Sequence, residues 1–331
     1  MKKIGIIANP NSGKDIRRIF SYALTIGNNE KANMIERMIS SAHHLGVDSF
    51  YMMPDSYEMG GSIKNTLENR GDLSDGFHIL DMNIDNNWKD TMKALELFQE
   101  EEMDVLIVMG GDGTSRLVAK SGVEIPLIAI STGTNNVYPD FSEGTIVGMA
   151  AAVVAEYGIQ PEYVQQDKVI EIYRNGSLQD VAVVYAVITD NEFIGSRALW
   201  DTQQIKQIIV ALSAPENIGF SSVIGITHAA EAKDDYGYRV TLNAEGSRKV
   251  LVPFGAGKMQ DLVTDEVVTM KLGEKHTYQA DHKGTLALDG ERTVLFKEGD
   301  KLDFVIERKG PHRVSIKKAL DFARKKGFFK Q

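Results

Sequence analysis

The sequence contains no cysteine, which excludes a disulfide framework, thiolate metal sites and a cysteine nucleophile. It also lacks an excess of positive charge, because 37 Lys and Arg residues stand against 46 Asp and Glu residues and give a net charge of −9. General binders of nucleic acid and of membrane surfaces depend on surplus Lys and Arg. We therefore predict no nucleic-acid partner and no membrane partner for this chain.

Long apolar runs are missing as well. No segment approaches the roughly 20 apolar residues that span a bilayer. The N-terminal sequence MKKIGIIANP has two lysines, but the apolar run that follows them is too short for the core of a signal peptide. These absences predict a cytoplasmic protein. Its 331 residues, 43% of them hydrophobic, suffice for two ordinary domains.

Residues 1–158 alternate strand-like and helix-like segments. The runs KKIGIIANP, DVLIVM and IPLIAIS are short and apolar, which is typical of buried strands. Apolar residues recur at helical spacing in 34–45, 87–103 and 145–157. Strands separated by helices of this length predict right-handed crossovers and a parallel sheet. We expect an α/β nucleotide-binding domain over residues 1–158.

Residues 159–315 have a different texture. Asn175-Gly176 separates two β-rich runs and is a strong signal for a tight hairpin. Several short strand-like runs follow, interrupted by one helix-like stretch, ALWDTQQIKQIIVALS. This half is predicted to be a mostly antiparallel, β-rich substrate domain. The basic segment 316–331 is predicted to form a helix that packs back on the first domain; its charges either steer an anionic ligand or form a solvated face.

The run VLIVM ends abruptly at Gly-Gly-Asp-Gly-Thr, residues 110–114. Ligands of parallel sheets bind beyond the carboxyl ends of the strands, where Gly110, Gly111 and Gly113 would let backbone amides approach phosphate oxygens. The charge of Asp112 would repel phosphates, so we expect this carboxylate to bind Mg²⁺, accept a proton or hold a hydroxyl. The alternative is that Asp112 caps the helix that begins near Thr114.

Two other segments follow strands of the same predicted sheet. After the first strand, backbone amides and a hydroxyl could hold nucleotide phosphates, or the turn could serve only for its shape; the residues concerned are Asn9, Ser12 and Gly13. The segment after residue 131 should face the same cleft as Asp112, and it contributes Thr132, Gly133, Thr134, Asn135 and Asn136.

Neither of two common phosphate-binding motifs is present in these segments. Gly13-Lys14 is followed by Asp15 rather than by Ser or Thr, so this segment is not a P-loop. Arg116 stands where the dinucleotide fingerprint requires its third glycine, so the turn at 110–114 is not an ordinary Rossmann turn.

Four segments together carry a resemblance to a known superfamily: ANPNSGKDIRR, MGGDGTSR, STGTNNVYP and LALDGER, at residues 8–18, 109–116, 131–139 and 286–292. In this order they resemble the superfamily of NAD kinases, diacylglycerol kinases and sphingosine kinases, and most closely its ATP-NAD kinase-like AcoX group. The resemblance implies two domains with a nucleotide cleft between them, ATP and Mg²⁺ as cofactors, and a homo-oligomer. It also implies that Asp112 lies beside the acceptor hydroxyl as the base.

The resemblance assigns further residues. Glu291, in Asp289-Gly290-Glu291, corresponds to a glutamate of the base network in lipid kinases, although a β-turn explains the same letters. Asn191 and Glu192 correspond to the Asn-Asp or Asn-Glu pair of NAD kinases. No dedicated metal motif is visible.

Three functions are compatible with these motifs. The first is an ATP-dependent phosphotransferase acting on a hydroxyl of NAD or of a related small molecule. The second keeps the chemistry and changes the acceptor to a lipid or polyol, because the segment that shapes the acceptor pocket of NAD kinases is not found here. The third is a nucleotide-binding regulator of acetoin catabolism without turnover.

Overall fold

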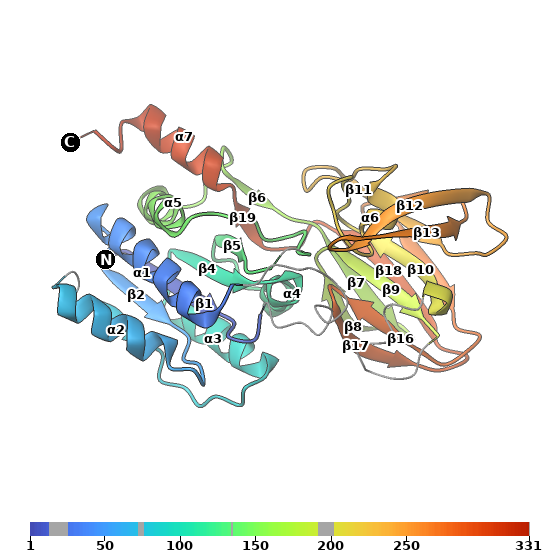
Figure 1. Ribbon diagram of the computed structural model, residues 1–331, viewed down its shortest axis with the longest axis horizontal. Helices are drawn as coiled ribbons and strands as arrows, with labels where there is room; N and C mark the ends of the chain where they lie inside the picture. Colours follow the sequence, from blue (N-terminus) through green and yellow to red (C-terminus); the bar gives the residue numbers. More distant parts are fainter. Residues whose placement is uncertain (13–25, 72–75, 134, 191–201, 331) are drawn as a thin grey trace.

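The computed structural model describes residues 1–12, 26–71, 76–133, 135–190 and 202–330, with only the backbone of 291–293. These residues form two lobes, with most of the helices in one and most of the strands in the other (Figure 1). The predicted fold class, an α/β domain with a parallel sheet followed by a β-rich part, is confirmed.

The described part of the first lobe contains a seven-stranded sheet in the order β3-β2-β1-β4-β5-β19-β6. Its first five strands are mutually parallel, β19 runs parallel to β5, and β6 is antiparallel to β19. The central strands are buried on both faces, which explains their unbroken apolar sequences. The strands are β1 (Lys3–Ala8), β2 (Ser49–Met52), β3 (Phe77–Ile79), β4 (Val105–Gly110), β5 (Leu127–Ser131), β6 (Val164–Gln166) and β19 (His312–Val314).

Helices cover both faces of this sheet. Ile4 and Ile6 of β1 pack on the face covered by α1, α2, α5 and α7, whereas Ile7 faces the core shared with α3 and α4. This alternation follows the two-residue period of a strand. The helices are α1 (Asn28–His44), α2 (Met59–Arg70), α3 (Trp88–Glu100), α4 (Asp112–Ser121), α5 (Gly144–Tyr157) and α7 (Ile316–Lys326).

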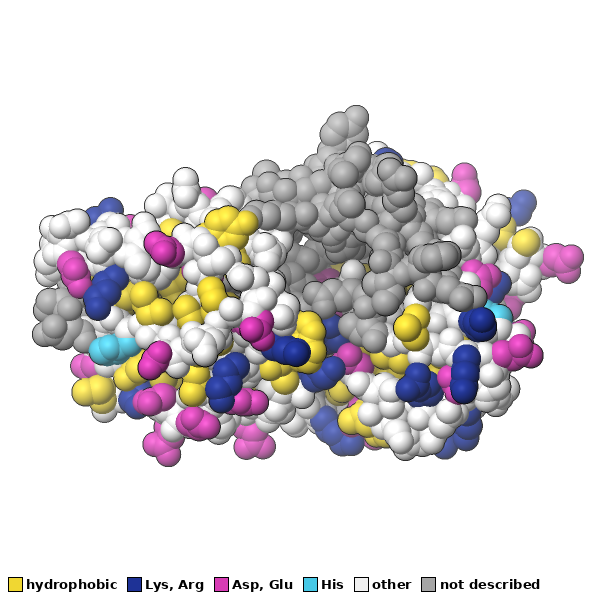
Figure 2. Space-filling view, turned by 90° about the horizontal axis from the view of Figure 1, so that it is seen from below, with side chains coloured by type: hydrophobic (Ala, Val, Ile, Leu, Met, Phe, Trp, Pro, Cys, Tyr) yellow, Lys and Arg dark blue, Asp and Glu magenta, His cyan; other side chains and the backbone are white. Residues whose placement is uncertain are grey.

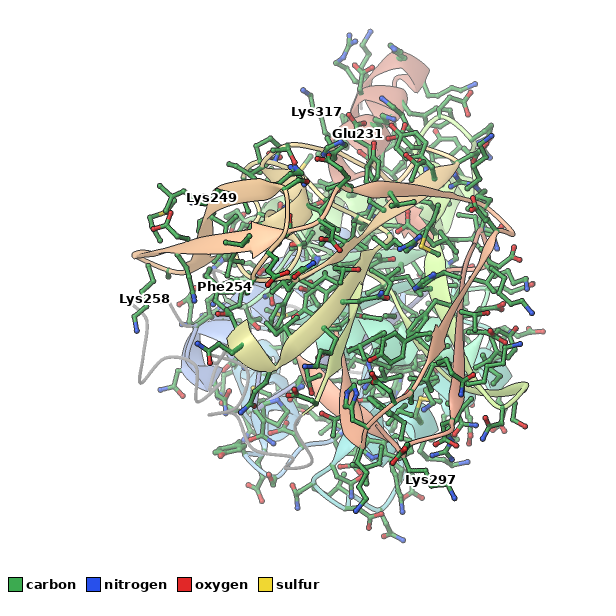
Figure 3. All side chains as sticks on the ribbon, turned by 90° about the vertical axis from the view of Figure 1, so that its right-hand side faces the viewer. Glu231, Lys249, Phe254, Lys258, Lys297 and Lys317 are labelled. Carbon is green, nitrogen blue, oxygen red and sulfur yellow. The ribbon has the colours of Figure 1, made fainter. Side chains whose placement is uncertain are left out.

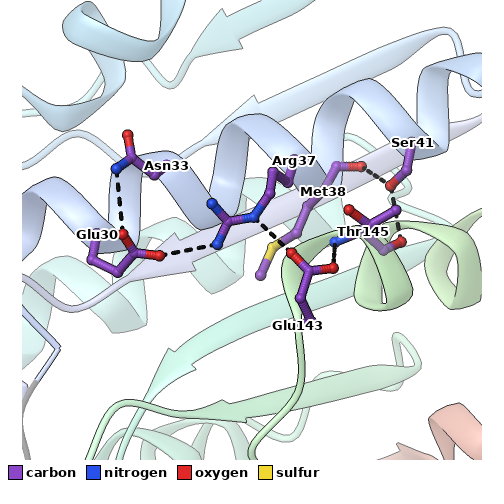
Figure 4. Close-up of polar contacts among 7 residues, drawn as sticks. All are labelled: Glu30, Asn33, Arg37, Met38, Ser41, Glu143 and Thr145. Carbon is purple, nitrogen blue, oxygen red and sulfur yellow. Dashed lines mark hydrogen bonds and ion pairs between the residues drawn. The ribbon is translucent and has the colours of Figure 1, made fainter.

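Helices α1 and α5 pack closely because α5 presents glycines to α1. A Cβ on Gly148 would collide with the carbonyl oxygen of Met38 and the hydroxyl of Ser41. Beside this contact, Arg37 Nε of α1 donates to Glu143 Oε1 at 2.6 Å, and the Ser41 hydroxyl donates to the carbonyl of Thr145 at 3.0 Å (Figure 4). The glycines on this face of α5 therefore set the distance between the two helices.

Gly148→Ala is expected to destabilise the protein by about 1–3 kcal/mol, the usual cost of overpacking a filled interface. Gly61→Ala in α2 is the matched control, since its added methyl meets no atom within 4 Å. The control should be neutral or stabilising by up to about 1 kcal/mol, because alanine favours helix. Urea unfolding of both variants measures the difference, and equal midpoints would contradict the packing argument.

The second lobe is built from antiparallel strands. Its described sheets are β14-β11-β10-β9-β16-β17, β15-β18-β7-β8 and the hairpin β12-β13. Ile172, Ile188, Leu286 and Phe304 pack in the core between the two larger sheets. The strands are β7 (Val169–Arg174), β8 (Ser177–Ala182), β9 (Tyr185–Thr189), β10 (Ile205–Val210), β11 (Tyr236–Thr241), β12 (Arg248–Gly255), β13 (Lys258–Thr264), β14 (Val268–Lys271), β15 (Lys275–Gln279), β16 (Gly284–Leu288), β17 (Glu291–Phe296) and β18 (Lys301–Glu307), and the short helices are η3 (Thr202–Gln204) and α6 (Ser222–Gly225).

One secondary-structure prediction in this lobe is wrong and another is confirmed. Within the stretch expected to be helical, Ile205–Val210 forms strand β10 between β9 and β11. Its β-branched residues fill the lobe's two cores, and this tertiary pairing overrides the helical spacing. The Asn175-Gly176 hairpin joins β7 to β8, with φ of 52° and 84° at the two residues, as a tight turn requires.

Two short connections join the lobes. The amide of Asp167 donates to the carbonyl of Pro311 at 3.0 Å, and the amide of Gly310 donates to the carbonyl of Asp167 at 2.9 Å. Strands β6 and β19 lie next to these connections and form the last two strands of the first sheet. The first sheet therefore includes residues beyond 158. Helix α7 follows β19 and packs on α5 (Figure 1), with Ala319 and Ala323 in the core of the first lobe.

Among the described residues on the face shown in Figure 2, acidic and basic side chains are interspersed over both lobes. The β12-β13 hairpin extends to the edge of the second lobe, with Lys258 at its end (Figure 3), and it exposes Leu251 and Met259. A homo-oligomer that uses this lobe stays a prediction. Among the described residues, no helix is long and apolar enough to cross a membrane.

Candidate active site

The three predicted loops meet at the carboxyl edge of the first sheet. The amide of Thr132 donates to the carbonyl of Gly110 at 3.2 Å, and Asn9 Nδ2 donates to Thr114 Oγ1 at 3.2 Å. The hydroxyl of Thr132 lies 2.9 Å from the hydroxyl of Ser12. The loops after β1, β4 and β5 are therefore joined directly to one another by hydrogen bonds.

The glycines of the loop after β4 allow this close approach. A Cβ on Gly110 would lie 2.5 Å from Thr114 Oγ1, and a Cβ on Gly111 would lie 2.8 Å from Asn136 Oδ1. Gly113 lies in the first turn of α4. A side chain at Gly110 would therefore displace Thr114 in the first turn of α4, and one at Gly111 would displace the side chain of Asn136.

Asp112 is held by the loop that follows β5. Its Oδ1 accepts hydrogen bonds from the amides of Val137 at 2.9 Å and Tyr138 at 2.8 Å. Helix α4 begins at Asp112 itself, and the N-cap residue Gly111 makes no side-chain cap. The helix-cap interpretation is therefore wrong. The carboxylate is 6% exposed and links β4 to the chain beyond β5.

The residues after β5 form a compact turn. Asn136 Nδ2 donates to Ser131 Oγ at 2.9 Å, and Ser131 Oγ donates to the carbonyl of Gly133 at 2.7 Å. Asn135 and Asn136 are half-buried and directly precede Val137, whose amide donates to Asp112. Thr134 lies outside the described residues, as do Gly13, Asn191 and Glu192.

Asp289 is a second buried carboxylate near the candidate site, and the sequence motifs did not predict a role for it. It lies in the turn between β16 and β17 and accepts hydrogen bonds from the amides of Val183, Val184 and Tyr185 at 2.6, 2.9 and 2.9 Å. Burial, followed by the nearby negative charge of Asp112, raises the pKa of Asp289 to about 7. Two carboxylates from opposite lobes therefore act on each other.

The turn at Asp289 also explains the letters Asp-Gly-Glu. Asp289 and Gly290 have φ of 49° and 87°, which is the left-handed conformation of a tight hairpin turn. Glu291 begins β17, and its side chain is outside the described residues. The β-turn interpretation is confirmed, while a role of Glu291 in a base network stays a prediction.

The pKa of Asp289 makes stability depend on pH. Between about pH 4 and 7 the folded protein keeps this proton while the unfolded chain has released it, so the contribution of Asp289 to stability falls as pH rises through that window and is constant above it. The stability of the wild type relative to Asp289→Asn should therefore fall by at least about 1 kcal/mol between pH 4.5 and 7.5. Urea unfolding at several pH values checks this; a difference independent of pH would contradict it.

A buried ion pair joins α4 to the second lobe. Arg116 of α4 lies 2.8 Å from Asp180 of β8, with side-chain exposures of 3% and 4%. Lys120, one turn further along α4, lies 3.2 Å from the same carboxylate. The helix that begins at Asp112 is therefore fixed to β8, as its position between the lobes in Figure 1 shows. No local sequence signal marks this pair.

The loop that holds Asp112 is supported from its other side by Arg313. The guanidinium lies 4.7 Å from the centre of the Tyr138 ring and donates to the carbonyl of Tyr138 at 3.0 Å. Arg313 Nε also lies 2.7 Å from Asp167 Oδ2. Burial raises the pKa of both Tyr138 and Asp167. The connection between the lobes and the Asp112 loop therefore share one buried cluster.

The described residues contain no group of three or more His, Asp or Glu side chains that could hold a metal ion. Asp112 and Asp289 nevertheless place two carboxylates at the lobe junction. Mg²⁺ commonly takes only one or two protein carboxylates and completes its shell with phosphate oxygens and water. Both carboxylates already accept backbone amides, so a Mg²⁺ ion at this place would take most of its ligands from a polyphosphate and water.

Two family models match different parts of the chain. Residues 4–157 match the family model of the ATP-NAD kinase N-terminal domain, and residues 168–309 match that of the acetoin catabolism protein X C-terminal domain. The chain is 32% identical over 309 residues to acetoin catabolism protein X of Cupriavidus necator, covering 90% of this chain and 86% of that protein. Yeast NADH kinase complexed with NADH is similar in structure, with a TM-score of 0.46 at 10% identity over 100% of this chain and 88% of the kinase chain.

Proposed function

Because the chain belongs to the acetoin catabolism protein X family and carries an N-terminal domain of ATP-NAD kinase type, we propose that it is an ATP-dependent phosphotransferase. The acceptor is a hydroxyl of NAD or of a related small molecule. The observation that carries this proposal is the position of Asp112, a carboxylate fixed at the start of α4 where three loops and the second lobe meet.

Phosphoryl transfer depends chiefly on positioning and on neutralising charge. In this proposal Asp112 orients the acceptor hydroxyl and accepts its proton, since its carboxylate is held by the amides of Val137 and Tyr138. The N-terminal end of α4 carries partial positive charge and favours the phosphates. Asp289 has a pKa of about 7, and when it is protonated the negative charge close to Asp112 and the phosphates is reduced. Bound Mg²⁺ would neutralise charge on the triphosphate.

A second candidate is a nucleotide-binding regulator of acetoin catabolism without turnover. The backbone bonds of Asp112 favour it, because a carboxylate that orders the 137–138 loop would be retained for structure even in a protein that had lost catalysis. A lipid or polyol acceptor keeps the chemistry of the first candidate, and no contact among the described residues favours it.

A ligand panel followed by an activity assay tests the proposal. Thermal shifts are measured with ATP, ADP, NAD, NADH and a short-chain diacylglycerol, each with and without Mg²⁺. Labelled phosphate transfer from ATP is then measured for every ligand that binds. Transfer to NAD or NADH supports the proposal, transfer to the lipid supports the lipid-kinase alternative, and binding without transfer supports the regulator. The absence of any nucleotide binding would refute both nucleotide-based functions.

A further inference from the structure

Lys31, in the first turn of α1, is buried beneath the loop after β1, with 0% of its surface exposed. Its Nζ donates to the carbonyls of Asn9 at 2.8 Å and Ser12 at 3.0 Å, and to Asn28 Oδ1 at 3.2 Å. Burial raises the pKa of Asp55, and the positive charge of Lys31 opposes this rise. A buried ammonium is costly unless it is paired and hydrogen-bonded, so its position is specified by these contacts.

These contacts reach all three loops of the candidate site. Asn9, whose carbonyl oxygen accepts from Lys31, donates through its side chain to Thr114 in the first turn of α4, directly after β4. Ser12, the second carbonyl partner, receives a hydrogen bond at its hydroxyl from Thr132 of the loop after β5. The ammonium group of Lys31 is therefore linked, through Asn9 and Ser12, to the segments that follow β1, β4 and β5.

The amides of the loop after β1 are largely used within the protein. The amide of Asn9 donates to the carbonyl of Met109 at 3.0 Å, that of Asn11 to Asn9 Oδ1 at 2.9 Å, and that of Ser12 to the carbonyl of Asn9 at 3.2 Å. A role of the Asn9 and Ser12 amides in holding phosphate stays a prediction, and it would require these amides to exchange their present partners. The ammonium group of Lys31 lies against the same loop, on the carbonyls of Asn9 and Ser12, and is a second source of attraction for an anion there.

We propose that Lys31 is a positioning residue of a polyphosphate subsite: it fixes the loop of residues 9–12 and places a positive charge next to it. The ligand class is the di- or triphosphate of a nucleotide, so this inference rests on the proposed function. Lys31 acts without touching the ligand, through the field of its ammonium and through the three loops that it orders.

The test compares adenosine, AMP, ADP and ATP binding by calorimetry in the wild type and in Lys31→Met, which keeps the length of the side chain and removes its charge. ATP binding should weaken about tenfold, the effect of one lost charge interaction of moderate strength, whereas adenosine binding should change less than twofold. Lys64→Met, at an exposed position of α2, is the matched control and should leave all four affinities unchanged.

Asn28→Asp is the second variant, because it separates charge from loop order. A carboxylate at the 3.2 Å contact neutralises the field of the ammonium while Lys31 still holds Asn9 and Ser12. ATP binding should again weaken more than adenosine binding, and this variant decides the matter if Lys31→Met does not fold. Equal losses for adenosine and ATP, or unchanged ATP binding, would overturn the inference alone. Failure of the wild type to bind any nucleotide would overturn the proposed function and the inference with it.

Discussion

Asp112→Asn is expected to reduce phosphate transfer at least about a hundredfold, the usual scale for loss of a general base. The asparagine Oδ1 can still accept from the amides of Val137 and Tyr138, so the loop should keep its shape. ATP binding should persist or tighten, since a negative charge near the phosphates is removed. Turnover and ATP affinity are measured on the same preparation.

Asp104→Asn is the matched control for this substitution. Asp104 immediately precedes β4, at the end remote from Asp112, and accepts a hydrogen bond from the amide of Lys3 at 2.7 Å. Its replacement should leave transfer unchanged. Near-normal turnover of Asp112→Asn would refute the catalytic role, and loss of ATP binding with an intact fold would indicate that Asp112 acts through the metal ion.

Arg116→Met is expected to destabilise the protein by about 3 kcal/mol, because it leaves the buried carboxylate of Asp180 without its main partner. Lys120 still contacts Asp180 at 3.2 Å in this variant. The loss of stability should therefore lie at the low end of the range of about 3–5 kcal/mol for broken buried ion pairs. Urea unfolding measures the change, and removal of the interlobe contact should also separate the transitions of the two lobes.

Arg37→Met is the control for this experiment. Arg37 also contacts two carboxylates, Glu30 and Glu143, but its side chain is 41% exposed, and loss of an exposed pair costs up to about 1 kcal/mol. If the two arginine variants lose equal stability, burial does not decide the strength of the Arg116 pair. The double variant Arg116→Met with Asp180→Leu should recover part of the loss, since no buried charge is then left unpaired.

Local sequence patterns were enough to predict the α/β fold of the first lobe and the meeting of its three loops at one edge of the sheet. Apolar runs mark β1, β4 and β5, and parallel strands separated by helices bring the ends of these strands to one edge of the sheet. The segments around Asn9, Asp112 and Thr132 could therefore be placed together before any contact was known. Both sources of this prediction, hydrophobic period and turn chemistry, are local properties of the chain.

Tertiary structure alone decided how each charged group is used. Asp289 binds amides more than 100 positions away, and Arg116 pairs with an aspartate 64 positions away, so no local pattern marks either contact. Lys31 also has no local sequence signal, because its burial depends on the packing of α1 against the loop after β1. Strand β10 is a further case, since its pairing with β9 and β11 overrides helical spacing. Local spacing predicts which face of an element is apolar, but the partner of a buried charge depends on distant segments that only the folded chain brings together.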